Sequence, residues 1–280
     1  MGRLFRTFGL FFVLLTLPFS LAAQEVAEDR FNLLSLPGGH FQMGDAHGDP
    51  NEAPHQAWVA PFRLMRFEVT NRQFADFVDE SGHVTDPETR GFGFVWDRSW
   101  SRIDGADWRN PQGPGDGPAH GIEGKYDHPV VQISAKDAAA FCAWYGLRLP
   151  SEEEWEFAAR GVDGRSFPWG NDPPAEGRQR RANFGTIPCC APDDKDGFYT
   201  TAPVGRFPAG ASPFGLEDMA GNVWEWTASS FPGRPDLVAL RGGGWGNNPY
   251  CLRTSYRHGN PPNIGLDMVG FRCAADAAAK

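Results

Sequence analysis

The chain carries five cysteines, the side chains with the widest choice of chemistry in this sequence. A cysteine thiolate can act as a nucleophile, bind a soft metal or form a disulfide. The five residues are Cys142, Cys189, Cys190, Cys251 and Cys273. Because the count is odd, at least one thiol has no partner for a disulfide within a monomer. That leftover thiol is the first candidate for a reaction.

Oxygen ligands offer a second kind of chemistry. Calcium takes roughly six to eight oxygens from carboxylates, amides and backbone carbonyls, held on tight turns that contain glycine. The segments 183–198 and 218–225 suit this demand, although their acidic residues could equally cap turns. The seven histidines show no metal-ligand spacing, such as two histidines four residues apart on a helix.

Three short helices are predicted to position these groups. Each starts at a serine or threonine N-cap with a partner three residues later: Thr70 with Gln73, Ser134 with Asp137, and Ser151 with Glu154. Gly161 can end the third helix in the left-handed conformation. The residues predicted to face the core are Phe74, Phe77 and Val78; Ala138, Phe141, Cys142 and Tyr145; and Trp155 and Ala158.

Short strands separated by glycine and proline turns are expected to complete a loop-rich domain. The predicted strands are 33–36, 41–43, 62–69, 130–133, 202–207 and 238–241. The stretch from Asp86 to Tyr126 shows no sustained periodicity and is longer than an ordinary connection. Its aromatic residues favour a functional loop packed on the domain over a disordered insert.

Composition and the first residues bear on location and partners. The net charge is −9, and the acidic balance argues against nucleic acid or an anionic membrane as a partner. Arg3 and Arg6 precede an apolar run from Phe8 to Leu17 and then small residues, the layout of a secretory signal peptide. We therefore expect a signal peptide at residues 1–23, one domain at 24–280, a periplasmic or secreted protein, and no membrane insertion after cleavage. In that oxidising compartment disulfides persist.

Several motifs in order resemble the formylglycine-generating-enzyme family, also called the sulfatase-modifying-factor domain. They are Gly39-His-Phe-Gln-Met-Gly44, Glu68-Val-Thr-Asn-Arg-Gln-Phe74, His128-Pro-Val-Val131, Leu147-Arg-Leu-Pro-Ser-Glu-Glu-Glu-Trp-Glu-Phe-Ala-Ala-Arg-Gly161, Phe167-Pro-Trp-Gly170, Asp218-Met-Ala-Gly-Asn-Val-Trp-Glu-Trp-Thr227, Leu240-Arg-Gly-Gly-Gly-Trp245 and Gly270-Phe-Arg-Cys273. The resemblance implies an α+β fold, similar in part to C-type lectins and poor in regular secondary structure. Fold by itself does not decide function.

The resemblance also implies calcium sites and a disulfide. The family's first structural calcium site maps onto the Asn183 side chain, the Phe184 carbonyl, Asp196 and the Phe198 carbonyl. Its second maps onto Asp218, the carbonyls of Gly221 and Val223, and Glu225; the family usually has asparagine where Asp218 stands. The family's disulfide pair maps onto Cys142 and Cys273.

The family's reaction centre departs from its usual pattern in this chain. Authentic formylglycine-generating enzymes hold copper(I) with two cysteines a few residues apart, and soft thiolates suit that ion. Here Gly242-Gly-Gly-Trp-Gly-Asn-Asn-Pro-Tyr-Cys251 keeps the second cysteine, whereas the first falls near Gly246 or Asn247. This motif alone predicts no copper site, and Cys251 is either catalytic or structural. The predicted pocket residues are Trp224, Trp245, Asn247, Asn248, Tyr250, Arg253 and Arg257.

Three functions remain open on these residues. Export and the incomplete cysteine pair favour the family's pyoverdine-maturation branch, which implies oxidation of a peptide-derived siderophore precursor, dihydropyoverdine to pyoverdine. The second function is a copper-dependent oxidase that activates sulfatases, with Cys251 and either Cys189 or Cys190 as ligands. The third is a non-catalytic binding or assembly protein, with the aromatics of 86–126 as its contact surface.

Overall fold

The computed structural model describes residues 30–115, 117, 120–174, 180–186 and 191–277. The predicted signal peptide and the pair Cys189 and Cys190 lie outside these ranges. Within them, no helix combines the length and apolar character needed to cross a membrane.

Short elements joined by long connections make up the chain. The helices are α2 (Asn71–Ser81), α3 (Asp86–Arg90), α4 (Ala135–Trp144) and α5 (Glu152–Arg160), with the 3-10 turns η1 (Pro50–Glu52), η2 (Pro208–Gly210) and η3 (Pro249–Leu252). The strands are β1 (Leu33–Leu36), β2 (Gly39–Met43), β3 (His55–Val59), β4 (Phe62–Met65), β5 (Phe92–Trp96), β6 (Trp100–Asp104), β7 (Trp224–Phe231), β8 (Arg234–Arg241), β9 (Arg257–Asn260), β10 (Val269–Gly270) and β11 (Ala274–Asp276). The α+β class predicted from the sequence is confirmed.

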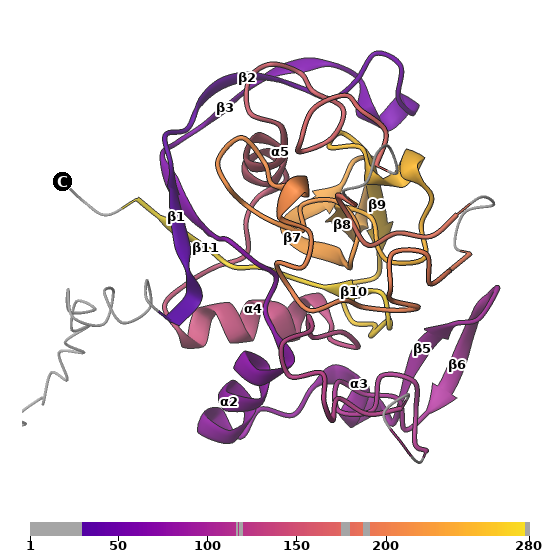
Figure 1. Ribbon diagram of the computed structural model, residues 1–280. Helices are drawn as coiled ribbons and strands as arrows, with labels where there is room; N and C mark the ends of the chain where they lie inside the picture. The colour runs from indigo at the N-terminus through magenta and orange to yellow at the C-terminus, as the bar shows by residue number, and fades with distance from the viewer. Residues whose placement is uncertain (1–29, 116, 118–119, 175–179, 187–190, 278–280) are drawn as a thin grey trace, which may run out of the picture.

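Small sheets, rather than one large one, organise these strands. The longest hairpin, β7–β8, lies in the middle of the molecule within a sheet of order β10-β7-β8-β9 (Figure 1). A second sheet has the order β1-β4-β11, so the first and last strands both pair with β4. The β2–β3 ribbon runs over one side of the molecule, and α2 and α4 lie on the opposite side (Figure 1).

The three predicted helices form where their caps indicate. Thr70, Ser134 and Ser151 each accept a hydrogen bond from the backbone N–H three residues later, and each capping box closes. Their predicted apolar faces are buried, with Phe74, Phe141 and Trp155 at 0% exposure. Tyr145 is the exception, because it caps the end of α4 and lies half-buried. Local hydrogen bonding and apolar spacing were therefore sufficient to place these helices.

Two predicted strands are absent and one is shorter than expected. Residues 130–133 bond to Val69 and Leu266 across irregular backbone, and Gln132 has a φ of 57°, which breaks an extended run. Residues 202–207 form turns because Pro203 lacks an N–H and Gly205 has a φ of 73°. Strand β4 ends at Met65, four residues before the predicted end at Val69.

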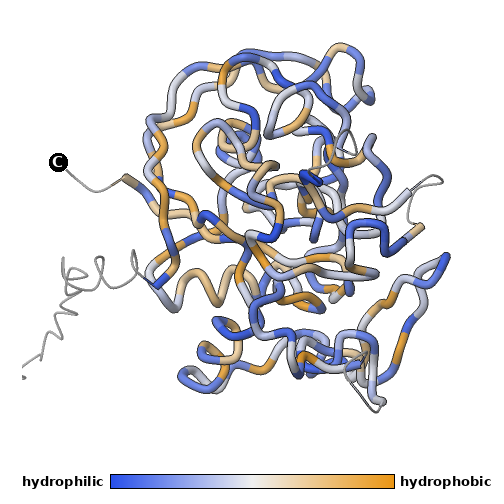
Figure 2. Tube along the Cα trace, in the orientation of Figure 1, coloured by the Kyte–Doolittle hydropathy of each residue, from blue (hydrophilic) through white to orange (hydrophobic). Residues whose placement is uncertain are grey.

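The segment 86–126, which we call the covering segment, contains α3 and the β5–β6 hairpin, neither of which was predicted. Apolar residues recur along the arms of the hairpin, and its tip is hydrophilic (Figure 2). Trp108 anchors the segment, since it is 2% exposed and its ring centroid lies 5.2 Å from that of Phe74. The buried Gln132 side chain donates to the carbonyls of Phe94 and Pro111 at 3.0 and 2.8 Å. The covering segment is thus packed on the domain, as predicted.

The predicted disulfide between Cys142 and Cys273 is confirmed. Their Cα atoms lie 5.7 Å apart although 131 residues separate them in the chain. The bond joins α4 to the start of β11 beside Phe141 and Phe271, whose ring centroids are 5.3 Å apart. Both cysteines are completely buried. The crosslink therefore lies inside the aromatic core.

Candidate functional site

The turn after β8 is closed by the buried side chain of Asn247. Asn247 is 3% exposed, its Oδ1 accepts from the Gly244 N–H at 2.8 Å, and its carbonyl accepts from the Gly185 N–H at 2.9 Å. An amide therefore fixes the turn that leads to Cys251. Cys251 lies in η3 and is 5% exposed. Cys142 and Cys273 are bonded to each other, so neither can be a second ligand beside Cys251.

Aromatic rings gather beside this turn in what we call the aromatic face, which consists of Trp224, Tyr250, Tyr256 and His258. The Trp224 ring centroid lies 5.9 Å from that of Tyr256 and 5.7 Å from that of His258. Tyr250 and Tyr256 are 5.5 Å apart. Tyr250 is 46% exposed, whereas Trp224 is 6% exposed and forms the floor. Tyr256 and His258 were not predicted as site residues.

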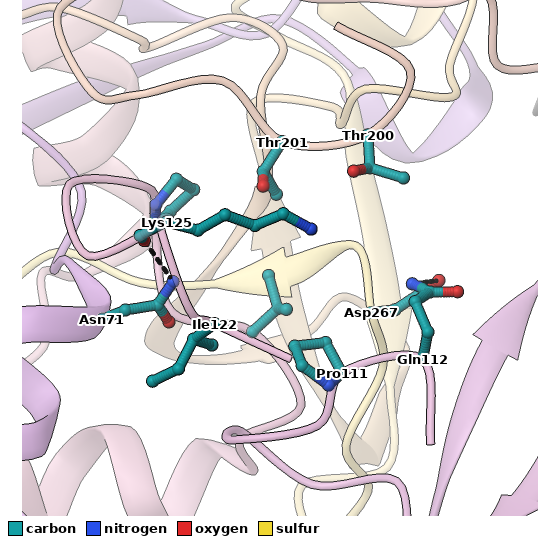
Figure 3. Close-up of a pocket in the computed structure, with 10 residues that line it drawn as sticks. Asn71, Pro111, Gln112, Ile122, Lys125, Thr200, Thr201 and Asp267 are labelled. Atoms are coloured by element: carbon teal, nitrogen blue, oxygen red, sulfur yellow. Dashed lines mark hydrogen bonds between the residues drawn. The ribbon is translucent and has the colours of Figure 1, made fainter. Parts of the chain in front are cut away.

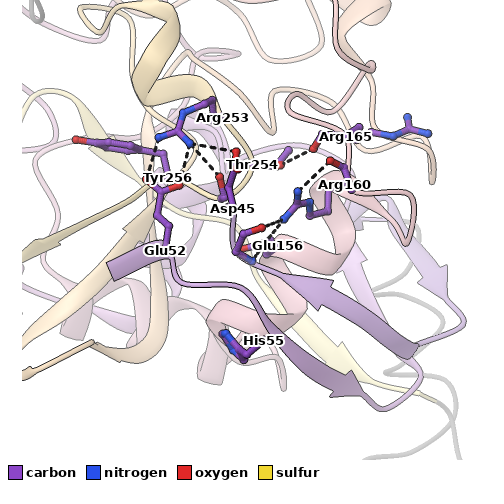
Figure 4. A network of polar contacts seen from close by, with 12 residues as sticks. Asp45, Glu52, His55, Glu156, Arg160, Arg165, Arg253, Thr254 and Tyr256 are labelled. Atoms are coloured by element: carbon purple, nitrogen blue, oxygen red, sulfur yellow. Dashed lines mark hydrogen bonds and ion pairs between the residues drawn. The ribbon is translucent and has the colours of Figure 1, made fainter. Parts of the chain in front are cut away.

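Both predicted pocket arginines make ion pairs, and Figure 4 shows that of Arg253. Arg253 makes a two-point ion pair with Glu52 at 2.8 and 2.9 Å and lies over the Tyr250 ring at 4.1 Å. Arg257 is 7% exposed and pairs with Glu152 at 2.9 Å. These arginines tie the η3 turn and β9 to η1 and α5. Through these ion pairs the two arginines hold in place the elements that carry the aromatic face.

Tyr250 and its neighbours fix the orientation of that face. The Tyr250 hydroxyl donates to Asp49 at 2.8 Å, and this hydrogen bond raises the pKa of the phenol. Asn248 caps η3 by accepting from the Tyr250 N–H at 3.1 Å. Trp245 is 2% exposed and donates its indole N–H to the Asp267 carbonyl at 3.2 Å. Of the predicted pocket residues, Tyr250 is exposed, Asn248 and Arg253 are half-buried, and the other four are buried.

The first predicted calcium site has a donor set that fits the ion. Asn183 is 1% exposed, and its Oδ1 is buried without a hydrogen-bond partner in the described structure. The Asp196 carboxylate accepts from the N–H groups of Phe184 and Phe198 at 3.1 and 2.9 Å, and burial raises its pKa. One carboxylate, one amide oxygen and two carbonyls suit a hard cation, which would crosslink the two ends of this loop. Within the described residues, no three His, Cys, Asp or Glu side chains converge as a metal centre.

Chelation tests this calcium prediction. We expect EGTA to lower the melting temperature of the purified protein, because an ion bound at a hundred times its Kd stabilises the folded state by about 2.7 kcal/mol. Asp196→Asn should remove the response to EGTA. Asp194→Asn is the matched control, since Asp194 is exposed in the same loop. Equal melting curves with and without calcium would contradict the prediction.

The second predicted calcium loop packs directly against the first. Gly221 has a φ of 82°, and a Cβ there would meet the Asn183 carbonyl oxygen at 2.2 Å, so only glycine allows this approach. Asn222 links the two loops, because its Oδ1 accepts from Asn183 at 3.2 Å and its Nδ2 donates to Glu68 at 2.6 Å. The carbonyls of Gly221 and Val223 belong to this same turn.

The acidic residues of the second loop lie in a buried charge cluster. Glu225 accepts from Arg272 through both oxygens at 2.7 Å, and one of them also accepts from the Trp155 indole at 2.8 Å. Burial raises the pKa of Asp218 to about 6, and burial with the charges of Asp218 and Glu225 raises that of Glu68. The carboxyl groups of Glu68, Asp218 and Glu225 thus share one guanidinium, that of Arg272. Glu225 is turned toward Arg272, and calcium at this second site stays a prediction.

A small recess lies between the covering segment and the residues around Thr200 and Asp267 (Figure 3). Its volume is about 20 Å³, and its lining includes Asn71, Gln112, Lys125, Thr200 and Asp267. Asp267 is 2% exposed, accepts from Gln112 at 2.8 Å and from the Trp96 N–H at 3.2 Å, and so joins the recess to the covering segment. Burial raises its pKa to about 7.

The raised pKa of Asp267 predicts a pH dependence of stability. Between about pH 4 and pH 7 the folded state holds a proton on Asp267 that the unfolded chain has lost, so the free energy of unfolding should fall as pH rises through that window. The contribution of this group is on the order of 4 kcal/mol, fully present below pH 4 and lost above pH 7. Urea unfolding of Asp267→Asn across this range should show a shallower slope than the unmodified protein. An unchanged slope would contradict the assignment.

The sequence reasoning missed several of these residues. Glu68 and Arg272 stand inside motifs that were recognised, and each is a lone charge between apolar neighbours, a pattern that signals a buried ion pair. Asp267 stands between Leu266 and Met268 and shows the same pattern, whereas Lys125 and Asn222 carried no such signal. They come together only because distant segments meet.

Comparisons with known proteins agree with this architecture. Residues 18–277 match the family model described as "Sulfatase-modifying factor enzyme 1-like domain". The chain is 40% identical to an inactive C-alpha-formylglycine-generating enzyme 2 from Bos taurus, over 88% of each chain. It is 36% identical to the formylglycine-generating enzyme of Thermomonospora curvata, over 90% of this chain and 95% of that one.

Solved structures show the same fold. PvdO from Pseudomonas aeruginosa superposes with a TM-score of 0.67 at 26% identity, covering 87% of this chain and 94% of that chain. The order of the motifs, the confirmed disulfide and the match along nearly the whole sequence point the same way. The chain belongs to the sulfatase-modifying-factor, or formylglycine-generating-enzyme, family.

Proposed function

We propose that the protein is an exported oxidoreductase that acts on the planar, dihydro form of a peptide-derived siderophore precursor, as in the maturation of dihydropyoverdine to pyoverdine. The observation that carries the proposal is the aromatic face, which stands beside a turn closed by Asn247 where the family's first thiolate falls. Offset and edge-on contacts with aromatic rings favour a flat chromophore as the bound group. The fold shared with PvdO supports the same substrate class.

The residues of this face would bind and orient the chromophore. Tyr250 offers an exposed ring whose hydroxyl is held by Asp49, and the cation of Arg253 lies behind that ring. A ring fixed in this way loses little rotational freedom when a substrate stacks on it. The oxidation removes two electrons and two protons from the chromophore, and dioxygen accepts them as hydrogen peroxide.

Turnover of the precursor tests the proposal. The mature protein should convert the dihydro precursor to the product lighter by two hydrogen atoms, with matching uptake of dioxygen, and a deletion strain should accumulate the precursor. Tyr250→Ala should raise KM about threefold to tenfold, because a lost aromatic contact costs about 0.5–1.5 kcal/mol. Tyr250→Phe should retain KM. Trp58→Ala is the control, since Trp58 is an exposed aromatic outside this face.

A second candidate function is a binding or assembly protein without catalysis. The observation that favours it is the 40% identity to a protein named as inactive. It predicts that the chromophore binds the aromatic face without consumption of dioxygen. Stoichiometric copper(I) binding, lost in Cys251→Ala, together with oxidation of a cysteine in a sulfatase peptide, would contradict both functions and favour the copper-dependent enzyme.

A further inference from the structure

The recess beside Asp267 has an opening and a buried floor. Asn71 and Asp267 are 3% and 2% exposed, whereas Gln112, Lys125 and Thr200 are half-buried. Its volume of about 20 Å³ exceeds the roughly 10–15 Å³ that one water molecule needs. The recess therefore has room for the polar end of a ligand, and an aromatic ring is too large for it.

The floor carries an acceptor that the protein leaves unused. Asn71 donates through Nδ2 to the Lys125 carbonyl at 2.9 Å, which fixes the orientation of the amide. Its Oδ1 is then buried without a hydrogen-bond partner in the described structure. Leaving a buried polar atom unpaired costs about 1–3 kcal/mol. A ligand that donates a hydrogen bond to this atom would recover that free energy.

The charges around the recess select the kind of ligand. Lys125 extends toward the space between Thr201 and Asp267 (Figure 3), and no carboxylate of the described structure pairs with its ammonium group. Burial lowers its pKa. A cationic ligand would be repelled by Lys125, and a carboxylate would bring a second acceptor against Asn71 Oδ1, which needs a donor. A neutral group with both a donor and an acceptor matches the lining.

The segment Asp267–Met268 links the backbone beside the recess to Trp224 and Trp245. The Trp245 indole donates to the Asp267 carbonyl at 3.2 Å, and the Trp224 N–H donates to the Met268 carbonyl at 2.9 Å. Asp267 and Met268 are both buried, so these hydrogen bonds fix the wall of the recess against the core.

We propose that the recess lined by Asn71, Lys125 and Asp267 is a subsite for a primary carboxamide, the group carried by asparagine and glutamine side chains. The carboxamide NH₂ donates to Asn71 Oδ1, and its oxygen accepts from the Lys125 ammonium. The subsite rests on the proposed peptide-derived substrate, because the carboxamide would be a side chain of that peptide.

Calorimetric titration with short peptides tests the subsite. The probes are tripeptides with a central Asn, Asp or Leu between glycines, blocked as N-acetyl and N-methylamide so that the side chain carries the only primary carboxamide. The Asn peptide should bind at least about tenfold more tightly than the Asp and Leu peptides, as expected for hydrogen bonds to charged groups. Equal affinities, or no binding of the Asn peptide up to its solubility limit, would overturn the proposal.

Variants assign the selectivity to the recess. Lys125→Met and Asn71→Leu should each weaken the Asn peptide about tenfold and leave the Leu peptide unchanged. Lys136→Met is the matched control, because Lys136 is exposed on α4 outside the recess. Selectivity that survives both recess variants would overturn the assignment. The peptide titration measures binding without turnover. If the protein keeps this selectivity but does not oxidise the precursor, the proposed reaction is wrong and the subsite still stands.

Discussion

Arg272→Met is expected to destabilise the protein by at least about 3–5 kcal/mol, the usual cost of removing one partner from a buried ion pair. Arg272 is 0% exposed and pairs with Glu225 through two hydrogen bonds of 2.7 Å. It also donates to the carbonyls of Met65, Arg66 and Glu217 at 2.9–3.1 Å. Methionine would leave these acceptors and the Glu225 charge buried without a donor. Urea unfolding at neutral pH measures the loss.

Arg272→Lys separates charge from geometry. Lysine keeps the positive charge but cannot form the two parallel hydrogen bonds of a guanidinium, so it should recover only part of the stability. The double variant Arg272→Met with Glu225→Gln should be less destabilised than the sum of the single changes, because the stranded charge is removed with its partner. If Arg272→Met unfolds at the same urea concentration as the unmodified protein, the prediction is wrong, because the buried charge of Glu225 is then balanced without Arg272.

Loss of the disulfide is the second large effect expected. In the chain-entropy model, opening a loop of 131 residues destabilises the folded state by roughly 5 kcal/mol. The double variant Cys142→Ala, Cys273→Ala should therefore unfold at a much lower temperature. The two sulfurs also fill space next to Phe141 and Phe271, so a small cavity adds to the cost.

Reductant provides the matched comparison for that variant. Dithiothreitol should lower the melting temperature of the unmodified protein nearly to that of the double variant, and it should leave the double variant unchanged. A response of the double variant as large as that of the unmodified protein would assign the stabilisation to other thiols.

Local sequence was enough to predict α2, α4 and α5, whereas the disulfide pair was implied by the family resemblance and α3 was missed. Capping boxes act within four residues, and the apolar stripes of α2, α4 and α5 need only a packed core to lie against. The strands were harder because their pairing is set by partners far along the chain. β4 pairs with β1 and β11, and its predicted extension stops at Met65 where that pairing ends. The β5–β6 hairpin was missed inside a stretch without periodicity.

The candidate site, like the fold, could be predicted only in part from the sequence. The motif around Tyr250 and Cys251 indicated its location, and the missing first cysteine indicated altered chemistry. That Arg253 and Arg257 support the site, instead of facing a substrate, depends on Glu52 and Glu152 arriving from other elements. A lone charge between apolar residues can signal a buried ion pair, but the sequence does not show which distant charge is its partner.

By itself, the sequence determined the family, the mixed α+β class, the helix starts and the half-cystines, because each of these depends on short-range spacing or on a motif read in order. Only the tertiary structure decided which buried charges meet. It also brought Trp224 and Tyr250 into one face with Tyr256 and His258. Finally, it placed Asn71, Lys125 and Asp267 in the lining of one recess. The physical reason is that these contacts join segments far apart in the chain. Their free energy exists only once the core has brought the segments together.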